Sequence, residues 1–534
     1  MEKGNFKLTK VDMTKILLSV IFISLVFFPL LTMFLHMDAQ SIQSVVSSPV
    51  FTASIKNSLI STTISTIITI VLAYALAMSV ERTNIKFKGM FAIVFVLPML
   101  VPSISNGMGL TILFGNNGIL TKMFNMSEGI YGLWGIVMGS VLYAFPVAYL
   151  MLSDVIRYED ASPYEAAKVL GLSKFRQFMA ITFPYLRKPL ISVVFSIFTL
   201  IITDYGVPLM IGGKYTTIPV VMYQEVIGQL NFGKGSVYGS LLLVPAIIAF
   251  VVDLINRDRG NSAYVVKKYV PSEGIVGKVF AYGMCLICSI FTMLPMASFV
   301  FLSFTKKYPK DISFTLANIE KTFKLRADEY LINSIIIAVL VAVVGVVIAF
   351  LTAYLSARIK SKVSRFLHLS SMTSAAIPGV VLGLAFVLSF KTTPIYGTLI
   401  ILIMVNLVHF ISSPYLMIYN SLSKINENLE DVAQIMCIDR AHLIKDVFIP
   451  MCKNTLLEMF SYFFANCMVT ISAVSFLANT SNKPVALMIN QFEAQMQLES
   501  AAVVSLMILI SNLLIKGTFH LLKKERTCDE RIGL

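Results

Sequence analysis

Long apolar runs separated by short polar segments follow one another along almost the whole chain. Each run exceeds the stretch of about 20 residues that an α-helix needs to cross a bilayer. Their length and continuity differ from the alternating pattern of a membrane β-barrel. The pattern predicts an all-α polytopic membrane protein with about 12 transmembrane helices. The predicted spans are 14–36, 55–80, 90–114, 131–153, 188–211 and 236–256 in the first half, and 277–303, 331–356, 367–390, 397–420, 454–477 and 498–520 in the second half.

Composition agrees with this prediction. Of the 534 residues, 57% are hydrophobic and only 13% are charged, whereas a soluble domain carries about 25% charged residues. The first apolar run follows Lys3, Lys7 and Lys10 and is long enough to span the bilayer. We therefore interpret it as a transmembrane helix rather than as the short apolar region of a signal peptide.

The net charge of +14 is distributed as a signal of membrane orientation. Lys and Arg are enriched in the cytoplasmic loops of membrane proteins. With the N-terminus inside, 31 of the 43 Lys and Arg residues fall in the inner segments, which are 1–15, 81–89, 154–189, 257–278, 358–365, 421–453 and the tail from 516. We expect a multi-pass protein of the cell (inner or plasma) membrane, surrounded by lipid, with both termini cytoplasmic. The positive charge then requires no nucleic-acid partner.

The two halves of the chain repeat one another. The stretch "LVPSISNGMGL" at 100–110 matches "AIPGVVLGLAF" at 376–386, so that Pro102 corresponds to Pro378. The stretch "AYLM" at 148–151 matches "PYLM" at 414–417, at a slightly smaller offset. Each half contains six predicted spans, so both halves enter the membrane in the same orientation and form a parallel repeat.

Each half also has one long polar segment on the predicted inner side. The first predicted domain, residues 1–270, carries it at 154–189, and the second, residues 271–534, carries it at 421–453. Both segments lie between the fourth and fifth spans of their repeat. Their polar composition places them at the membrane surface rather than in lipid. An amphipathic helix that only anchors the loop among the lipid headgroups is the simpler alternative.

The first polar segment predicts a helix, a tight turn and a second helix. Residues 163–170, "PYEAAKVL", begin with a proline and continue with good helix formers. Gly171 follows where a helix end requires a positive φ. An amphipathic helix comes next, and we expect Pro184 to end it. The helix–turn–helix would lie at the cytoplasmic surface.

The second polar segment is a degenerate copy of the first. It contains Asp431, Ala433, Cys437 and Pro450 at the positions that correspond to Glu165, Ala167, Gly171 and Pro184. A β-carbon at a residue with positive φ costs about 1 kcal/mol. Either the second turn differs from the first, or the two segments are unequal in function.

These segments resemble a known motif. Glu165-Ala166-Ala167, Gly171 and Pro184 are similar to the EAA loop of the permease subunits of binding-protein-dependent (type I) ABC importers. The resemblance implies that the loop docks on an ATPase subunit, and that the two loops of this chain engage two copies of the ATPase. It also implies one extracytoplasmic solute-binding protein and transport by alternating access. The permease would be non-catalytic and would hold no cofactor, because ATP and Mg bind to the ATPase subunits.

A closer resemblance concerns the transported solute. Four stretches are similar to fused permeases assigned to the import of 2-aminoethylphosphonate. They are "TDYGVPLMIGGKY" at 203–215, "YQEVIGQLNFGKGS" at 223–236, "LLLVPAIIAFVVD" at 241–253 and "MVTISAVSFL" at 468–477. Fused ferric-iron and thiamine permeases share the same layout and are the alternatives. An ion-coupled secondary transporter with a 6+6 repeat, or a membrane-embedded enzyme, would instead require a proton relay or a catalytic cluster.

Candidate pathway residues lie within the apolar runs. Asp204, followed by Tyr205, lies inside a predicted span, and a carboxyl group is costly to bury in a membrane. It either forms a gate or contact for the solute, or accepts hydrogen bonds from backbone N–H groups at a helix break. Ser103 and Asn106 either line the pathway or form a small polar packing face.

Two other motifs are weak. The stretch "GQLNFGKGS" at 228–236 imitates a phosphate-binding loop, but Gly235 follows its lysine where Ser or Thr is needed. Cys285 and Cys288 form a CxxC pair within an apolar run. Since a metal site needs four ligands, we interpret the pair as packing residues and expect no metal site.

Overall fold

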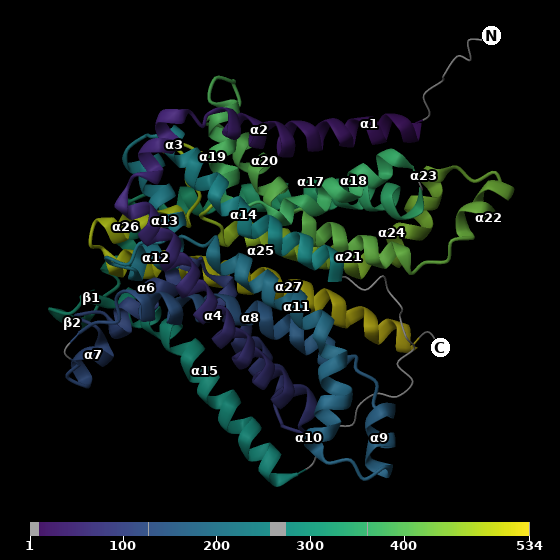
Figure 1. Cartoon of the computed structure of the whole chain (residues 1–534), viewed down its shortest axis with the longest axis horizontal. Coiled ribbons are helices and arrows are strands. Elements are labelled where there is room, and N and C mark those ends of the chain that lie inside the picture. The colour runs from purple at the N-terminus through teal and green to yellow at the C-terminus, as the bar shows by residue number, and fades with distance from the viewer. Residues whose placement is uncertain (1–9, 127, 257–273, 360, 533–534) are drawn as a thin grey trace.

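The computed structural model describes residues 10–126, 128–256, 274–359 and 361–532. Figure 1 shows a bundle of helices, and a single two-stranded hairpin is the only sheet within these described residues. The predicted all-α membrane fold is confirmed. The predicted boundary between residues 270 and 271 lies outside the described residues.

The first half consists of helices and their short connections. Its elements are α1 (Lys10–Phe22), η1 (Ile23–Phe27), α2 (Phe28–Leu35), α3 (Ala39–Val46), α4 (Pro49–Arg82), α5 (Lys88–Val96), η2 (Leu97–Leu100), α6 (Ser103–Phe114), α7 (Ile119–Met123), α8 (Leu133–Arg157), α9 (Ser162–Val169), α10 (Lys174–Gln177), η3 (Phe178–Thr182), α11 (Phe183–Ile202), α12 (Gly206–Ile211), α13 (Ile218–Tyr223), η4 (Gln224–Gly228) and α14 (Phe232–Asn256).

The second half begins with one long helix and the hairpin. Its elements are α15 (Ile275–Ser303), β1 (Thr305–Lys307), β2 (Asp311–Phe314), α16 (Ala317–Lys324), α17 (Ala327–Arg358), α18 (Lys362–Thr373), η5 (Ser374–Ala376), α19 (Gly379–Phe390), α20 (Leu399–Phe410), α21 (Ser412–Ser423), α22 (Leu429–Ile435), α23 (Arg440–Leu443), η6 (Ile444–Phe448), α24 (Ile449–Met451), α25 (Lys453–Val469), α26 (Leu487–Ala494) and α27 (Leu498–Ile532).

Not all of the predicted spans are single straight helices. The described residues contain 8 helices long and apolar enough to cross a membrane, or up to 11 if each of three bent pairs is one span. The third and ninth predicted spans bend by 101° and 111°. Proline disfavours a helical conformation at the residue before it, and Val101 and Ile377, which precede Pro102 and Pro378, are extended.

The tenth and eleventh predicted spans also need correction. The tenth, 397–420, is the pair α20 and α21, bent by 53°. The eleventh, 454–477, is shorter than expected, because α25 ends at Val469 and the chain continues in turns. Thr470 adopts an extended conformation with ψ 134°, which stops the helix.

Helices of the two halves begin at positions that the sequence repeat relates to one another. α6 and α19 begin at Ser103 and Gly379, which correspond in the matched stretches 100–110 and 376–386. α14 and α27 begin at Phe232 and Leu498, which are related by the same offset as 148–151 and 414–417.

The first helix of each half packs on the other half. α1 and α2 lie against α17, α18 and α19, while α15 lies against α4, α5 and α6. Cys285 and Cys288 of α15 are buried in this contact, in one apolar cluster with side chains of α4, α5 and α8. The two halves are therefore joined by an exchange of helices as well as by their facing surfaces.

Both polar loops emerge at the same end of the bundle. In Figure 1, α9 and α10 lie at the lower right, and α22 and α23 at the upper right. The short helices α3, α12, α13 and α26 and the β-hairpin lie at the left. We call the right-hand side the loop end and the other side the opposite end.

Candidate coupling loops and transport cavity

The first loop contains a short helix closed by a glycine turn. α9 ends in two hydrogen bonds: the Gly171 N–H donates to Lys168 O at 3.0 Å, and the Leu172 N–H donates to Ala167 O at 3.0 Å. This pair of bonds is a Schellman motif, which requires a left-handed residue after the helix. Gly171 is that residue, with φ 69°. The predicted helix and turn are confirmed.

The second loop forms the same turn without the glycine. The Cys437 N–H donates to Gln434 O at 3.1 Å and the Ile438 N–H to Ala433 O at 2.8 Å. Cys437 has φ 54°, so it takes the left-handed conformation despite its β-carbon. Of the two alternatives left open by the sequence, a different second turn is therefore wrong.

We predict that Cys437→Gly stabilises the second turn by about 0.5–1 kcal/mol. A residue with a β-carbon pays about 1–2 kcal/mol to adopt the left-handed conformation, and glycine avoids this cost. Glycine also loses more conformational entropy on folding, which offsets about 0.5–1 kcal/mol of the stabilisation. Thermal unfolding of the purified chain in detergent measures the effect. The matched control is Cys437→Ala, which removes the thiol but keeps the β-carbon and should leave the midpoint unchanged. Equal thermal unfolding midpoints for the Cys437→Gly and Cys437→Ala variants would contradict backbone strain at Cys437.

The helix after the first turn does not end where the sequence predicted. α10 continues through the π-helical turn η3 into α11, so the helix passes Pro184 and runs on to Ile202. A π-helical turn changes the hydrogen-bonding pattern of a helix and accommodates a missing N–H. The second half has its π-helical turn η6 at the same place, directly before Ile449 and Pro450.

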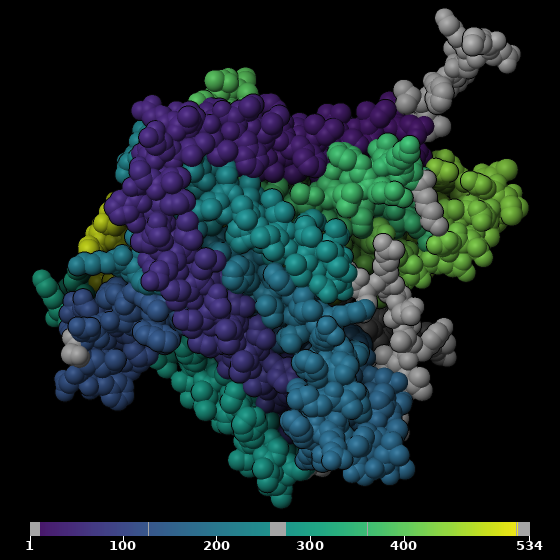
Figure 2. Space-filling model, viewed as in Figure 1, coloured from purple at the N-terminus to yellow at the C-terminus, as the bar shows by residue number. Residues whose placement is uncertain are grey.

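The tips of the two loops expose apolar side chains at corresponding positions. Val169 and Leu170 are 90% and 76% exposed in the first loop, and Ile435 and Met436 are 83% and 64% exposed in the second. Ala167 and Ala433, on the inner face of each short helix, are buried. Figure 2 shows the two loops as separate protrusions on the right. Apolar side chains exposed on two matching protrusions are typical of a surface that another protein covers.

The predicted motif residues lie on both faces of these loops. Glu165 and Ala166 are exposed on α9, and Asp431 is exposed on α22. Pro184 and Pro450 are exposed in the first turns of α11 and α24. These members lie at the surface of the loops, whereas Ala167 and Ala433 hold each short helix against its own half.

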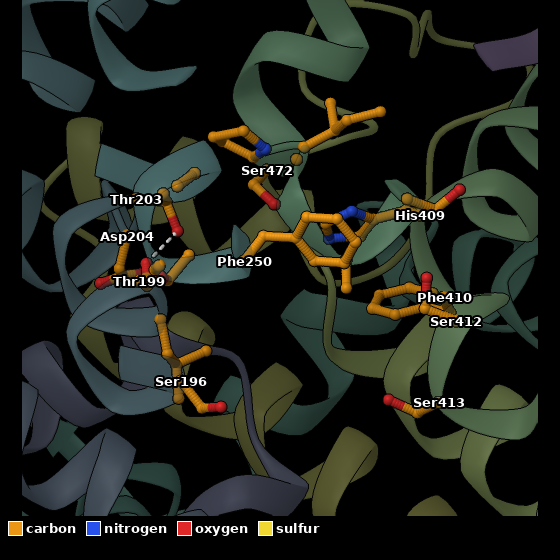
Figure 3. Close-up of a pocket in the computed structure, with 18 of the residues that line it drawn as sticks. Ser196, Thr199, Thr203, Asp204, Phe250, His409, Phe410, Ser412, Ser413 and Ser472 are labelled. Atoms are coloured by element: carbon orange, nitrogen blue, oxygen red, sulfur yellow. Dashed lines mark hydrogen bonds between the residues drawn. The ribbon is translucent and has the colours of Figure 1, made fainter. Parts of the chain in front are cut away.

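A cavity of about 350 Å³ lies between the two halves. In Figure 3, Ser196, Thr199, Thr203 and Asp204 line one side, and His409, Ser412 and Ser413 line the facing side. Its remaining wall residues are Tyr143, Phe195, Leu200, Ala246, Ala249, Phe250, Asp253, Ser374, Ala375, Ile377, Pro378, Gly379, Phe410, Tyr462, Asn466 and Ser472. The lining therefore has two carboxyl groups and many hydroxyl groups, and none of these residues is Lys or Arg.

Asp204 lies in the break between α11 and α12 and also lines this cavity. It follows α11, and its carboxylate accepts hydrogen bonds from the N–H groups of Val207 at 3.0 Å and Gly206 at 3.4 Å. The Ser103 hydroxyl bonds to the same carboxyl group. The structure therefore shows the cap on freed backbone groups that was one of the two alternatives, and it places Asp204 in the cavity lining.

Tyr205 directly follows Asp204 and lies outside the cavity lining. Its side chain is fully buried, and its hydroxyl lies 2.6 Å from the Ser475 hydroxyl of the other half. Its ring stacks on the ring of Tyr223, with the ring centroids 4.9 Å apart. The centroids of the Tyr223 and Phe476 rings are 6.1 Å apart. We call this set of contacts the tyrosine closure, and α12, which begins directly after Tyr205, lies at the opposite end in Figure 1.

The other two predicted pathway residues do not line the cavity. Ser103 contacts it only through Asp204. The Asn106 side chain is fully buried and donates to Pro98 O at 3.2 Å, across the bend of its own broken helix. Ser105 lies 2.9 Å from Ser505 of the other half. Asn106 therefore belongs to the packing face that the sequence offered as an alternative, and the neighbouring Ser105 is part of the same face.

Sequence reasoning missed His409 as a cavity residue. Asn406, one helical turn before it, does not pair with it but donates to Leu402 O of its own helix at 2.8 Å. His409 lines the cavity, as does Tyr143, its counterpart by the offset that relates 148–151 to 414–417. That repeat offset is the signal that could have found this pair. Among the described residues, no group of three or more His, Cys, Asp and Glu side chains is arranged to hold a metal ion.

Comparisons with known proteins match both halves of the chain to one family. Residues 69–257 and 345–526 each match the family described as "Binding-protein-dependent transport system inner membrane component". The chain is 25% identical over 482 residues to "Putative ferric transport system permease protein FbpB 1" of Haemophilus influenzae, covering 85% of this chain and 76% of that protein.

Two further relatives extend the comparison. The ferric transport system permease protein FbpB of Actinobacillus pleuropneumoniae is 24% identical over 418 residues, which cover 74% of this chain and 61% of that protein. The thiamine transport system permease protein ThiP of Brucella abortus is 26% identical over 146 residues, which cover 26% of this chain and 27% of that protein. Because the family matches account for more than half of the sequence, this chain belongs to the inner membrane components of binding-protein-dependent transport systems, the permeases of ABC importers.

Proposed function

We propose that this chain forms the whole membrane pathway of its importer, with one coupling loop in each half for one ATPase subunit. The observation that supports this most is the pair of loops. Both have the same closing turn, both expose two apolar side chains at corresponding positions, and both lie at one end of the bundle. A partner with two equal subunits would cover both.

The orientation follows from the same loops. The loop end faces the cytoplasm, where ATP is available, and the opposite end faces the solute-binding protein. In this arrangement the tyrosine closure separates the cavity from the binding-protein side, and the cavity lies toward the cytoplasm. The structure then corresponds to the inward-facing state of an alternating-access cycle, and the closure must open for a solute to enter.

We propose ferric iron as the cargo. Hard metal cations prefer oxygen ligands, and the cavity offers the carboxyl groups of Asp204 and Asp253 among many hydroxyl groups. The relatives that match over most of this chain are named for ferric transport. Thiamine, also a cation, is supported by a shorter match.

The phosphonate predicted from the sequence is the second candidate. The stretches at 203–215 and 468–477, which carry that resemblance, lie at the cavity and at the tyrosine closure. Asp204 would receive the amine of 2-aminoethylphosphonate, but none of the lining residues is a Lys or Arg that would hold the phosphonate group. An anionic group prefers such partners, so the lining favours the cations.

Co-purification and uptake test the proposal. The tagged chain, purified from its native membrane, is expected to bring an ABC ATPase and a solute-binding protein with it. Calorimetry on that binding protein with ferric iron, thiamine and 2-aminoethylphosphonate then identifies the cargo, and uptake of the same solute into proteoliposomes should require ATP. Tight binding of the phosphonate alone would overturn ferric iron and keep the importer. Uptake driven by an ion gradient without ATP would contradict the proposed mechanism.

A further inference from the structure

A buried polar network holds the first coupling loop to two membrane helices. Arg82, the last residue of α4, forms an ion pair with Glu159, and their side chains are only 9% and 3% exposed. The hydroxyl of Tyr164, on α9, donates to Glu159 at 2.5 Å and lies 2.6 Å from the hydroxyl of Thr182. The Arg82 guanidinium also lies 5.4 Å from the centre of the Tyr164 ring. We call Arg82, Glu159, Tyr164 and Thr182 the first clamp.

Burial makes the clamp dependent on all of its members. Burial is the largest influence on the pKa of the Glu159 carboxyl and raises it. The hydrogen bond from Tyr164 and the positive charge of Arg82 act to lower the same pKa. A buried charge is tolerated when it is paired and hydrogen-bonded, and removing one partner is strongly destabilising. The four side chains should therefore move together rather than separate.

The second loop is held by an equivalent set. Arg358, the last residue of α17, forms an ion pair with Glu430 of α22. Its guanidinium also donates to Ile425 O and Asn426 O, both at 2.7 Å, and lies 5.3 Å from the centre of the Phe448 ring. We call Arg358, Glu430 and Phe448 the second clamp.

The two clamps join the same three elements with different chemistry. Arg82 and Arg358 both end the second long membrane helix of a repeat, α4 and α17. The repeat offset that relates 148–151 to 414–417 also places Tyr164 on Glu430, in the short loop helices. It places Thr182 on Phe448, at the ends of η3 and η6. A shared position with changed residue types indicates that the connection itself is retained.

We propose that the two clamps transmit movement of the coupling helices to the cavity, with Arg82 and Arg358 as positioning residues. This inference rests on the proposed function of the loops. Movement of α9 pulls Thr182, directly before α11, the helix that ends beside Asp204, and pulls Arg82 at the end of α4. The loop helix thus drives two helices of its half at once, instead of one through the chain connection alone.

The test uses the complete complex in proteoliposomes, with its own ATPase and binding protein and with ferric iron as the probe. Arg82→Met removes the charge at similar length, and Tyr164→Phe removes only the hydroxyl that joins Glu159 to Thr182. Both variants should assemble with the ATPase and hydrolyse ATP, but the iron imported per ATP hydrolysed should fall by about tenfold. The binding protein should no longer stimulate hydrolysis.

A neighbouring ion pair provides the matched control. Arg157 donates to Glu81 at 2.8 Å, between the ends of α8 and α4, but the Arg157 side chain is 49% exposed. Arg157→Met removes a guanidinium from a neighbouring pair between α8 and α4 without opening the buried network. The iron imported per ATP should stay within about twofold of wild type, because exposed pairs contribute little.

Each outcome decides the inference. Unchanged transport per ATP in both clamp variants would overturn it, and so would loss of the ATPase from both complexes, which would leave the clamp as a support for docking only. If Arg82→Met does not accumulate in the membrane, Tyr164→Phe decides alone. A wild-type chain that recruits no ATPase would contradict the proposed function of the loops and, with it, the clamps.

Discussion

Replacing Glu165 and Gly171 together is expected to abolish uptake while the chain stays inserted in the membrane. Glu165 is exposed on α9, and Gly171 holds the left-handed turn that presents Val169 and Leu170. Gly171→Val introduces a β-branched side chain at φ 69°, which costs about 1–2 kcal/mol or more. Losing a central interface residue costs about 2 kcal/mol or more, so Glu165→Ala with Gly171→Val should weaken ATPase binding by about thirtyfold or more.

The measurement is co-purification of the ATPase together with ATP-dependent uptake. Gly89→Ala is the matched control, because Gly89 lies in the helix α5 and no atom lies within 4 Å of an added β-carbon. That variant should transport normally. Uptake at the wild-type rate in the Glu165 and Gly171 double variant would mean that the ATPase docks elsewhere.

Asp204→Asn is expected to lower uptake of a cation by about tenfold or more, with the ATPase complex intact. The asparagine oxygen can still accept from the Val207 N–H, so the helix break is largely kept. The variant removes a carboxylate from the cavity, and a hydrogen bond to a charged group contributes about 1.5–3 kcal/mol. The reduction should therefore appear in uptake rather than in assembly.

The matched control for this variant is Ser105→Ala. It removes a buried contact between the halves, the 2.9 Å pair with Ser505, without changing the cavity lining. Uptake by this control should remain near wild type. An Asp204→Asn chain that fails to assemble, while Ser105→Ala assembles, would assign Asp204 to the structure of the helix break and not to the pathway.

The sequence alone determined the features that depend on local properties. The length of an apolar run predicts a membrane helix because about 1.5 Å of rise per residue must cover the bilayer. The turn at Gly171 was predictable because few residues other than glycine adopt a positive φ. The two loops were predictable because a repeat preserves spacing, and this same spacing relates Tyr143 to His409.

Local patterns were insufficient where proline and tertiary contacts compete with hydropathy. The runs 90–114 and 367–390 are apolar throughout, yet each bends at a proline because the residue before it is extended. Pro184 has the opposite outcome, since the π-helical turn before it lets the helix continue. Cys437 takes a positive φ against its preference, because the hydrogen bonds of the turn and the packing of Ala433 hold it there.

Only the tertiary structure decided which residues meet between the halves. Tyr205 and Ser475 are 270 positions apart, and Asp204 faces His409 across the cavity. The first helix of each half crosses to the other half, so neither half packs as an independent unit. Such contacts depend on the packing of whole helices, and hydropathy specifies that a helix is buried in a membrane without specifying its neighbours. The sequence thus determined that this chain spans the membrane and presents two loops, and the tertiary structure decided where the cavity between the halves lies.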